Sequence, residues 1–201
     1  MRDVVRRTAG EERFLLAGEV LFDLQYQHYS LSYFRVSQGH IPAERYADPF
    51  HPMMIAVTGF DDREMINRAL LYRYIISYEP FHFKGDLEDF PSTLAYGKRV
   101  DAFRETYAAY LWDAEFRDTR GAHVKAEGSP AILYSVFKQP ASGLRAVVIV
   151  NDETEAPAVI SLALEGGARR LCWATPEEPV LRALDYSLTV PPRSACMVAE
   201  Q

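Results

Sequence analysis

The chain has 201 residues, of which 48% are hydrophobic and 25% are charged, and its formal net charge is −6. This composition is ordinary for a globular protein and excludes an intrinsically disordered chain. After Arg120, seven Lys and Arg residues stand against nine Asp and Glu residues, and the preceding part is also acidic. Neither part has the basic surface that nucleic-acid binding requires, so we expect no nucleic-acid partner.

The first residues, MRDVVRRTAGEERFLLAGE, lack the continuous apolar segment of a signal peptide. No apolar run approaches the roughly 18 residues that span a membrane, so we expect a cytoplasmic protein with no membrane partner. Cys172 and Cys196 both lie in strand-like runs, and we expect buried free thiols rather than a disulfide. The sequence has neither a zinc-ligand spacing nor a phosphate-binding glycine loop, which predicts no metal and no cofactor.

The first predicted elements are a strand, a helix and a loop. FLLAG, from Phe14 to Gly18, is a short apolar run that indicates a buried strand ending at Glu19. The aromatic and apolar residues of VLFDLQYQHYSLSYFR, residues 20–35, fit a helical period loosely. Residues 39–52 contain a glycine and three prolines, a composition that predicts a loop.

Two further strand and helix pairs follow. MMIAVTG, residues 53–59, is the second predicted strand, and a helix begins after it, where Asp61 and Glu64 have the spacing of a capping box. IISYEPFHF is the third predicted strand, and it ends near Glu79 and His82. A third helix starts at Pro91, because proline is favoured in a first turn, and it extends to Trp112.

The last third of the chain has another pattern. Short runs rich in Val, Ile and Leu, such as ILYSVFKQ, LRAVVIV and YSLTVPPRSACMV, alternate with turn residues and predict a small antiparallel β-sandwich. Of the 12 Tyr, 11 Phe and 2 Trp residues, only four lie after Gly121. This change places a domain boundary between Asp118 and Lys125. We therefore expect an α/β region over residues 1–120, with about three βα units, and an all-β domain over residues 121–201.

Alternating strands and helices predict a parallel sheet, in which chemistry is carried at the carboxyl ends of the strands. Glu19, Glu79 and His82 stand at these ends and are the predicted catalytic residues. Two carboxylates that face one groove are what glycosidic-bond hydrolysis requires. Each residue also has a structural interpretation: Glu19 can favour the start of the next helix, Glu79 can cap a turn, and His82 can be a core histidine.

A second set of polar residues surrounds these strand ends. They are the predicted substrate-binding residues Asp23, His28, Arg35 and Asp61. Solvation or ion pairing is the structural alternative for each of them. The nearby aromatic residues, such as Tyr26 and Tyr29, could stack on sugar rings, although packing in the core is the favoured explanation.

A family resemblance joins these observations. AGEVLFDLQYQHYSLSYFR, TGFDDREMINRALLYRYIISYEPFHFKG, YLWDAEFRDTRGAHV, VVIVND and LTVPPRSACMV together resemble the C-terminal portion of glycoside-hydrolase-like (β/α)8 barrel proteins. In such proteins the last barrel helix leads into a β-sandwich. The resemblance covers nearly the whole chain and implies a carbohydrate substrate or ligand.

A complete barrel has eight βα units and about 250 residues, so the resemblance implies that most of the barrel is missing. The chain is then a fragment, or it completes its sheet by association, or its fold is smaller than the family's. An incomplete barrel leaves an open sheet edge, which predicts self-association. Two functions remain open: part of a glycoside hydrolase, inactive when isolated, or a noncatalytic carbohydrate-binding or structural module.

Overall fold

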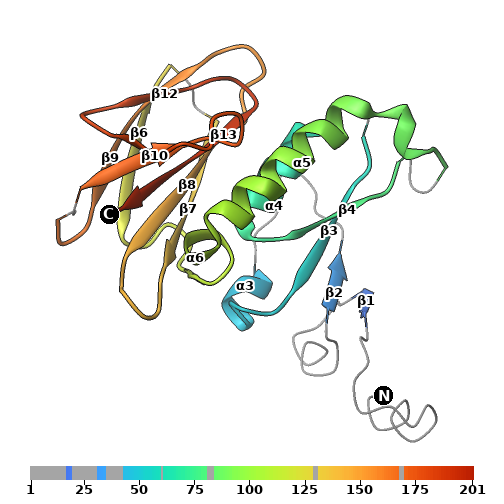
Figure 1. The fold of residues 1–201 in the computed structure, drawn as a ribbon, viewed down its shortest axis with the longest axis horizontal. Helices are drawn as coiled ribbons and strands as arrows, with labels where there is room; N and C mark the ends of the chain where they lie inside the picture. Colours follow the sequence, from blue (N-terminus) through green and yellow to red (C-terminus); the bar gives the residue numbers. More distant parts are fainter. Residues whose placement is uncertain are drawn as a thin grey trace, which may run out of the picture.

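The computed structural model describes residues 17–19, 31–34, 43–59, 61–80, 84–128, 131–167 and 170–201, with the backbone alone for residues 17–19 and 32–34. Figure 1 shows a parallel sheet on one side, a layer of helices beside it, and two antiparallel sheets on the other side. The helical layer is shared, because it packs against both the parallel sheet and one antiparallel sheet.

The parallel sheet contains four strands in the order β1-β2-β3-β4. They are β1 (Ala17–Glu19), β2 (Leu31–Phe34), β3 (Met53–Val57) and β4 (Ile75–Tyr78). Every neighbouring pair is parallel, which confirms the predicted parallel pairing. The predicted helix over residues 20–35 is wrong at Leu31–Phe34, which form β2; residues 20–30 lie outside the described part. Aromatic and apolar residues at these positions suit a strand as well as a helix.

A short helix, α3 (Ala43–Ala47), occupies part of the segment predicted as a loop. Pro49 and Pro52 come after the last residue of the helix, so they limit its length instead of excluding it. The next helix, α4 (Arg63–Tyr72), is capped by Asp62, whose carboxylate accepts a hydrogen bond of 3.1 Å from the Met65 N–H. The capping residue is therefore one position later than the predicted Asp61.

The predicted third helix is present in two pieces. They are α5 (Pro91–Thr106) and α6 (Ala108–Leu111), and Pro91 lies in the first turn of α5 as expected. A single 3-10 turn, η1 (Leu87–Asp89), precedes α5. The two helices are interrupted at Tyr107, which has non-helical backbone angles.

Two antiparallel sheets follow. The first has the order β11-β10-β13-β8-β7-β5, and its strands are β5 (Glu115–Phe116), β7 (Ile132–Lys138), β8 (Arg145–Asn151), β10 (Leu171–Ala174), β11 (Arg182–Ala183) and β13 (Ser194–Glu200). The second has the order β12-β9-β6, with β6 (Ala122–Glu127), β9 (Ala158–Leu164) and β12 (Leu188–Val190). No described residue after Lys125 is helical.

Strand β8 shows how these layers are joined. Ala146, Val148 and Val150 face the cluster that contains the helices, whereas Val147 and Ile149 belong to the cluster shared with the three-stranded sheet. Because side chains alternate along a strand, a strand covered on both faces reads as a continuous apolar run. The run AVVIV therefore marks the central strand of the molecule, and the core continues across the predicted domain boundary.

The two cysteines are buried and free, as predicted. Cys196 lies in β13, at the centre of the six-stranded sheet. Burial raises the pKa of its thiol to about 12. This side chain is therefore a packing group and not a nucleophile.

Candidate functional site at the strand ends

The carboxyl edge of the parallel sheet carries several of the predicted site residues. Glu19 is the last residue of β1, Asp61 follows β3, and Glu79 follows β4. Parallel strands end at the same edge, so the three backbones lie on one side of the sheet. The backbone of Glu79 continues the ladder by one step, since its N–H donates to the Val57 carbonyl at 2.9 Å.

Glu79 is a buried carboxylate. Only 2% of its surface is exposed, and its Oε1 accepts a hydrogen bond of 3.2 Å from Ser77. Its Oε2 is buried and has no hydrogen-bond partner among the described residues. Buried polar groups are nearly always paired, so an unpaired carboxylate oxygen at a strand end marks a group that is able to contact a ligand.

Strand polarity predicts that Glu19 and Glu79 end adjacent parallel strands and face a common groove, and the predicted adjacency is wrong. β1 and β4 are the two outer strands of the described sheet. The register aligns Glu19 with Tyr33, Tyr33 with Met54, and Met54 with Ile75. Glu19 is therefore level with Ile75, four residues before Glu79.

Neighbouring strands lie about 4.8 Å apart and rise about 3.3 Å per residue. In a flat sheet, the backbones of Glu19 and Glu79 are then about 14 Å apart across the strands and about 13 Å apart along them. A retaining or inverting pair requires about 5 to 10 Å between its carboxyl groups. The backbone positions of Glu19 and Glu79 do not support their action as a direct pair.

Asp61 and Asp62 have different surroundings. The Asp61 carboxylate accepts a hydrogen bond of 3.1 Å from Arg193, which also donates to the Asp61 carbonyl at 2.7 Å. The Asp62 carboxylate accepts from the N–H groups of Gly59 and Met65. Burial raises the pKa of Asp62, and these backbone hydrogen bonds oppose the rise. Asp61 thus joins the start of α4 to the turn before β13.

The remaining predicted residues cannot be placed from their side chains. His82, Asp23, His28 and Arg35 lie outside the described residues, and Glu19 is described by its backbone alone. Their roles stay predictions. In the part of the chain that the structure describes, no three His, Cys, Asp or Glu side chains are grouped as metal ligands.

A small cavity of about 180 Å³ lies at the opposite edge of the sheet. Its walls include Met53 and Ile75, the first residues of β3 and β4, and two buried arginines, Arg45 and Arg73. Arg45 donates to the Tyr72, Arg73 and His51 carbonyls, and Arg73 donates to the Trp112 and Ala114 carbonyls. These arginines satisfy carbonyl groups at the end of α4 and in the chain after α6, which is a structural role.

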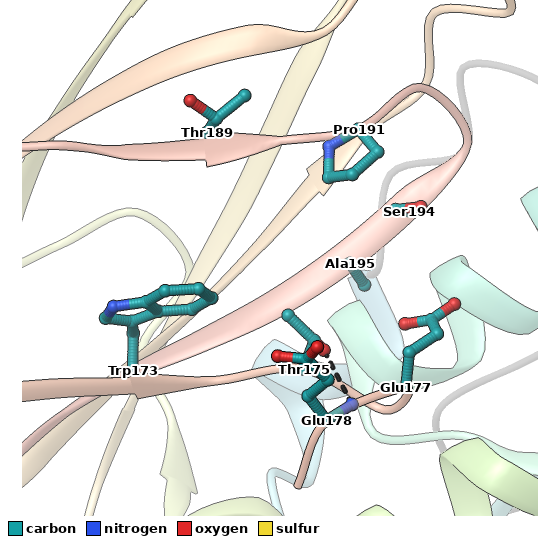
Figure 2. A pocket seen from close by; sticks show the side chains of 8 residues that line it. All are labelled: Trp173, Thr175, Glu177, Glu178, Thr189, Pro191, Ser194 and Ala195. Atoms are coloured by element: carbon teal, nitrogen blue, oxygen red, sulfur yellow. Dashed lines mark hydrogen bonds between the residues drawn. The ribbon is translucent and has the colours of Figure 1, made fainter. Parts of the chain in front are cut away.

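A larger pocket of about 320 Å³ was not predicted from the sequence. It lies between β12 and β10, with the start of β13 at its base, as Figure 2 shows. The lining residues are Trp173, Thr175, Glu177, Glu178, Thr189, Pro191, Ser194 and Ala195. The only signal in the sequence is a lone tryptophan in a strand, which is more often a core residue.

Comparisons with known proteins bear on the fold. No protein-family model matches the chain, and no curated protein matches it. Two solved structures have a similar fold: a noncanonic maltogenic α-amylase, AmyB, from Thermotoga neapolitana, and an α-amylase from Anoxybacillus assigned to a new glycosyl hydrolase subclass.

The first matches with a TM-score of 0.61 at 10% identity, and the match covers 98% of this chain and 57% of the amylase. The second has a TM-score of 0.54 at 12% identity, over 98% of this chain and 54% of the other. The chain thus spans a little over half the length of these structures. Such low identity shows similarity of fold, which supports the resemblance to glycoside hydrolases at that level. Among the described helices, none is both long and apolar enough to cross a membrane.

Proposed function

We propose that the chain is the C-terminal part of a carbohydrate-active enzyme of the glycoside-hydrolase type. The observation that supports this best is the match of 98% of the chain to just over half of each α-amylase. In this proposal, β1 to β4 are half of a (β/α)8 barrel. The sheets of residues 121–201 are the β-sandwich domain that follows it.

The unpaired edges of the parallel sheet support the incomplete barrel. Among the described strands, β1 pairs only with β2, and β4 pairs only with β3. A closed barrel has no free edges, because its first and last strands pair with each other. Four further strands would pair with β1 on one side and with β4 on the other.

The site of this proposal is the carboxyl edge, with Glu19, Glu79 and His82 in catalysis and with Asp23, His28, Arg35 and Asp61 around the sugar. Glycoside hydrolysis needs one carboxyl group to protonate the leaving oxygen and another to activate water or attack the sugar. Since Glu19 and Glu79 start from distant backbone positions, each would act with a carboxylate from the missing strands. The isolated chain would then be inactive.

The test compares two proteins: the 201-residue chain, and the same chain with the polypeptide encoded directly upstream of it. Because both structural neighbours are named α-amylases, maltohexaose is the first substrate to assay, by release of reducing ends. We expect hydrolysis by the longer protein only. We also expect Glu19→Gln and Glu79→Gln to lower its kcat by at least about 100-fold.

Two results would overturn this proposal. One is an upstream sequence that encodes no βα units, and the other is a longer protein with intact carboxylates that cleaves no glycoside. Saturable sugar binding without cleavage would then favour the noncatalytic carbohydrate-binding module. The cytoplasmic location stays a prediction.

A further inference from the structure

The pocket of about 320 Å³ between the antiparallel sheets has the features of a ligand site. Its volume is at the lower end of the range of about 300 to 1,000 Å³ for small-molecule pockets. One wall is the indole of Trp173 in β10, and the opposite wall is Pro191 at the end of β12, whereas the Thr189 side chain points away from the indole (Figure 2). The space therefore suits a single ring bound against an aromatic face.

Trp173 is held in place by its neighbours in the sheets. Its indole is partly buried against the cluster shared by the two sheets, and the Arg182 guanidinium lies 5.7 Å from the ring centroid. The indole also lines the pocket. An aromatic ring fixed by packing offers a flat apolar surface at little entropic cost, and the apolar C–H face of a sugar matches such a surface.

The polar groups of the pocket are arranged for hydroxyl groups. Glu177 and Glu178 supply carboxylate oxygens, which accept hydrogen bonds. Thr175 Oγ1 accepts a hydrogen bond of 3.0 Å from the Glu178 N–H, so its hydroxyl proton can be donated elsewhere. An apolar wall beside a few oriented donors and acceptors is the usual composition of a site for a polyhydroxylated ligand.

The charges of the pocket favour a neutral ligand. Glu177 lies 3.6 Å from Arg63 Nη2, and Glu178 Oε2 lies 2.5 Å from Arg182 Nη2. Each carboxylate is thus balanced by an arginine and keeps further lone pairs for hydrogen bonds. Because the carboxylate charges are already compensated by the two arginines, the pocket offers no net attraction to a cation or to an anion.

The pocket is also connected to the strand-end site. Arg63, which contacts Glu177, is the first residue of α4 and follows directly after Asp61 and Asp62. Because α4 begins where β3 ends, the pocket and the carboxyl edge lie at the same end of the helical layer. A saccharide chain bound in the pocket would be kept near the edge at which catalysis is proposed.

We propose that this Trp173 pocket binds one sugar ring of a neutral oligosaccharide, as a second carbohydrate site separate from the strand ends. The inference rests on the proposed carbohydrate function. It makes no use of Glu19 or Glu79, and the site performs no bond cleavage. Its role is to hold a saccharide chain on the protein.

The chain has two tryptophans, Trp112 and Trp173, so Trp112→Phe leaves one fluorescent reporter in the pocket. We expect the emission of this variant to change saturably as maltotriose is added. Pro191→Arg should weaken the binding by at least about tenfold, since Pro191 is an exposed residue whose ring lies on the Trp173 side of its strand, and arginine would fill the space. Ser161→Arg, at an exposed position on the neighbouring strand β9, is the matched control and should bind as the parent does.

Trp173→Ala, followed by calorimetry, should abolish binding, and Pro191→Arg keeps the test valid if this variant fails to fold. Glu79→Gln should leave maltotriose binding in the pocket unchanged, which separates this site from the catalytic proposal. The absence of a saturable signal up to about 10 mM maltotriose would overturn the inference. Equal affinity in the Pro191→Arg and Ser161→Arg variants would do the same.

Discussion

At the residue scale, the unpaired oxygen of Glu79 gives a direct test of whether this side chain serves function or stability. Glu79 is buried, and Ser77 is the one hydrogen-bond partner that the described residues give its carboxylate. Burying a carboxyl group with an unpaired oxygen costs more free energy than burying a neutral amide does. We expect Glu79→Gln to raise the free energy of unfolding by about 1 kcal/mol, as measured by urea denaturation.

The control for this change is Ser77→Ala, which removes the hydrogen bond to Glu79 Oε1. It should lower the free energy of unfolding by about 1 to 2 kcal/mol. If Glu79→Gln instead destabilises the chain as much as Ser77→Ala does, Glu79 is a structural residue. Its assignment to the strand-end site would then be lost.

Asp152 gives a prediction about pH. Its side chain is 16% exposed and lies 2.8 Å from Arg68, yet burial raises its pKa above the ordinary value of 3.8, and Arg68 only partly opposes the rise. The folded state therefore holds the proton more tightly than the unfolded state does. This contribution to stability is complete below pH 3.8 and is lost as the pH rises through the folded pKa.

Asp152→Asn keeps an oxygen acceptor for Arg68 and removes this titration. We expect the stability of the variant, relative to the parent, to improve as the pH rises above the ordinary carboxyl pKa of 3.8, because only the parent has to lose this tightly held proton. Chemical denaturation at a series of pH values measures this difference. A relative stability that falls over the same range would show that pairing with Arg68 outweighs burial.

At the element scale, the ion pair of Arg145 and Glu200 joins β8 to β13, and it is more than an ordinary surface ion pair. Arg145 contacts both carboxylate oxygens of Glu200, at 3.0 Å and 2.9 Å, and also donates to the Glu165 and Gly167 carbonyls. Glu200 is buried, and its hydrogen bonds raise the pKa of Arg145. Removing one member leaves a buried charge without its partner, so Arg145→Met should lower the free energy of unfolding by about 3 kcal/mol.

The matched control is the half-buried pair of Arg117 and Glu115, which lie 2.9 Å apart and are much more exposed than Glu200. Because solvent screens this pair, Glu115→Gln should change stability by less than about 0.5 kcal/mol. Thermal unfolding of the two variants beside the parent separates the cases. Similar losses of stability in the two variants would mean that the burial of Glu200 does not strengthen its pair with Arg145.

The elements with strong local signals were predictable from the sequence. β3, α4, α5 and the long strands β7, β8 and β13 have clear periodicity or continuous apolar runs. The short elements β2, β5 and β11 were missed, because strands this short depend on their neighbours and not on their own pattern. The Trp173 pocket was missed for the same reason: its walls come from β10, β12 and β13, which meet only in the folded chain.

At the scale of the whole molecule, motifs that carried the family resemblance have structural roles. In PPRSA, the Arg193 carbonyl accepts from Asn67 of α4, and its guanidinium binds Asp61. In VVIVND, Asn151 donates to the Ala156 and Val190 carbonyls and fixes the end of β8. Arg193 thus attaches the antiparallel sheets to the helical layer, and Asn151 holds the end of β8 within those sheets. The resemblance could therefore indicate the fold, whereas the catalytic role of the strand ends stays a proposal.

The last prediction concerns the open sheet. β4 is an edge strand among those described, and Ile75 in it is 36% exposed, with Phe50 51% exposed near it. Unpaired edges and exposed apolar side chains favour association, so the purified chain should form concentration-dependent oligomers in light scattering. Ile75→Glu should reduce this association, because a charge on an edge strand opposes edge pairing.

Val180→Glu, at a loop position 64% exposed, adds the same charge away from the edge and should have no effect. A parent chain that stays monomeric at every concentration would mean that the edge is covered, and would count against an incomplete barrel.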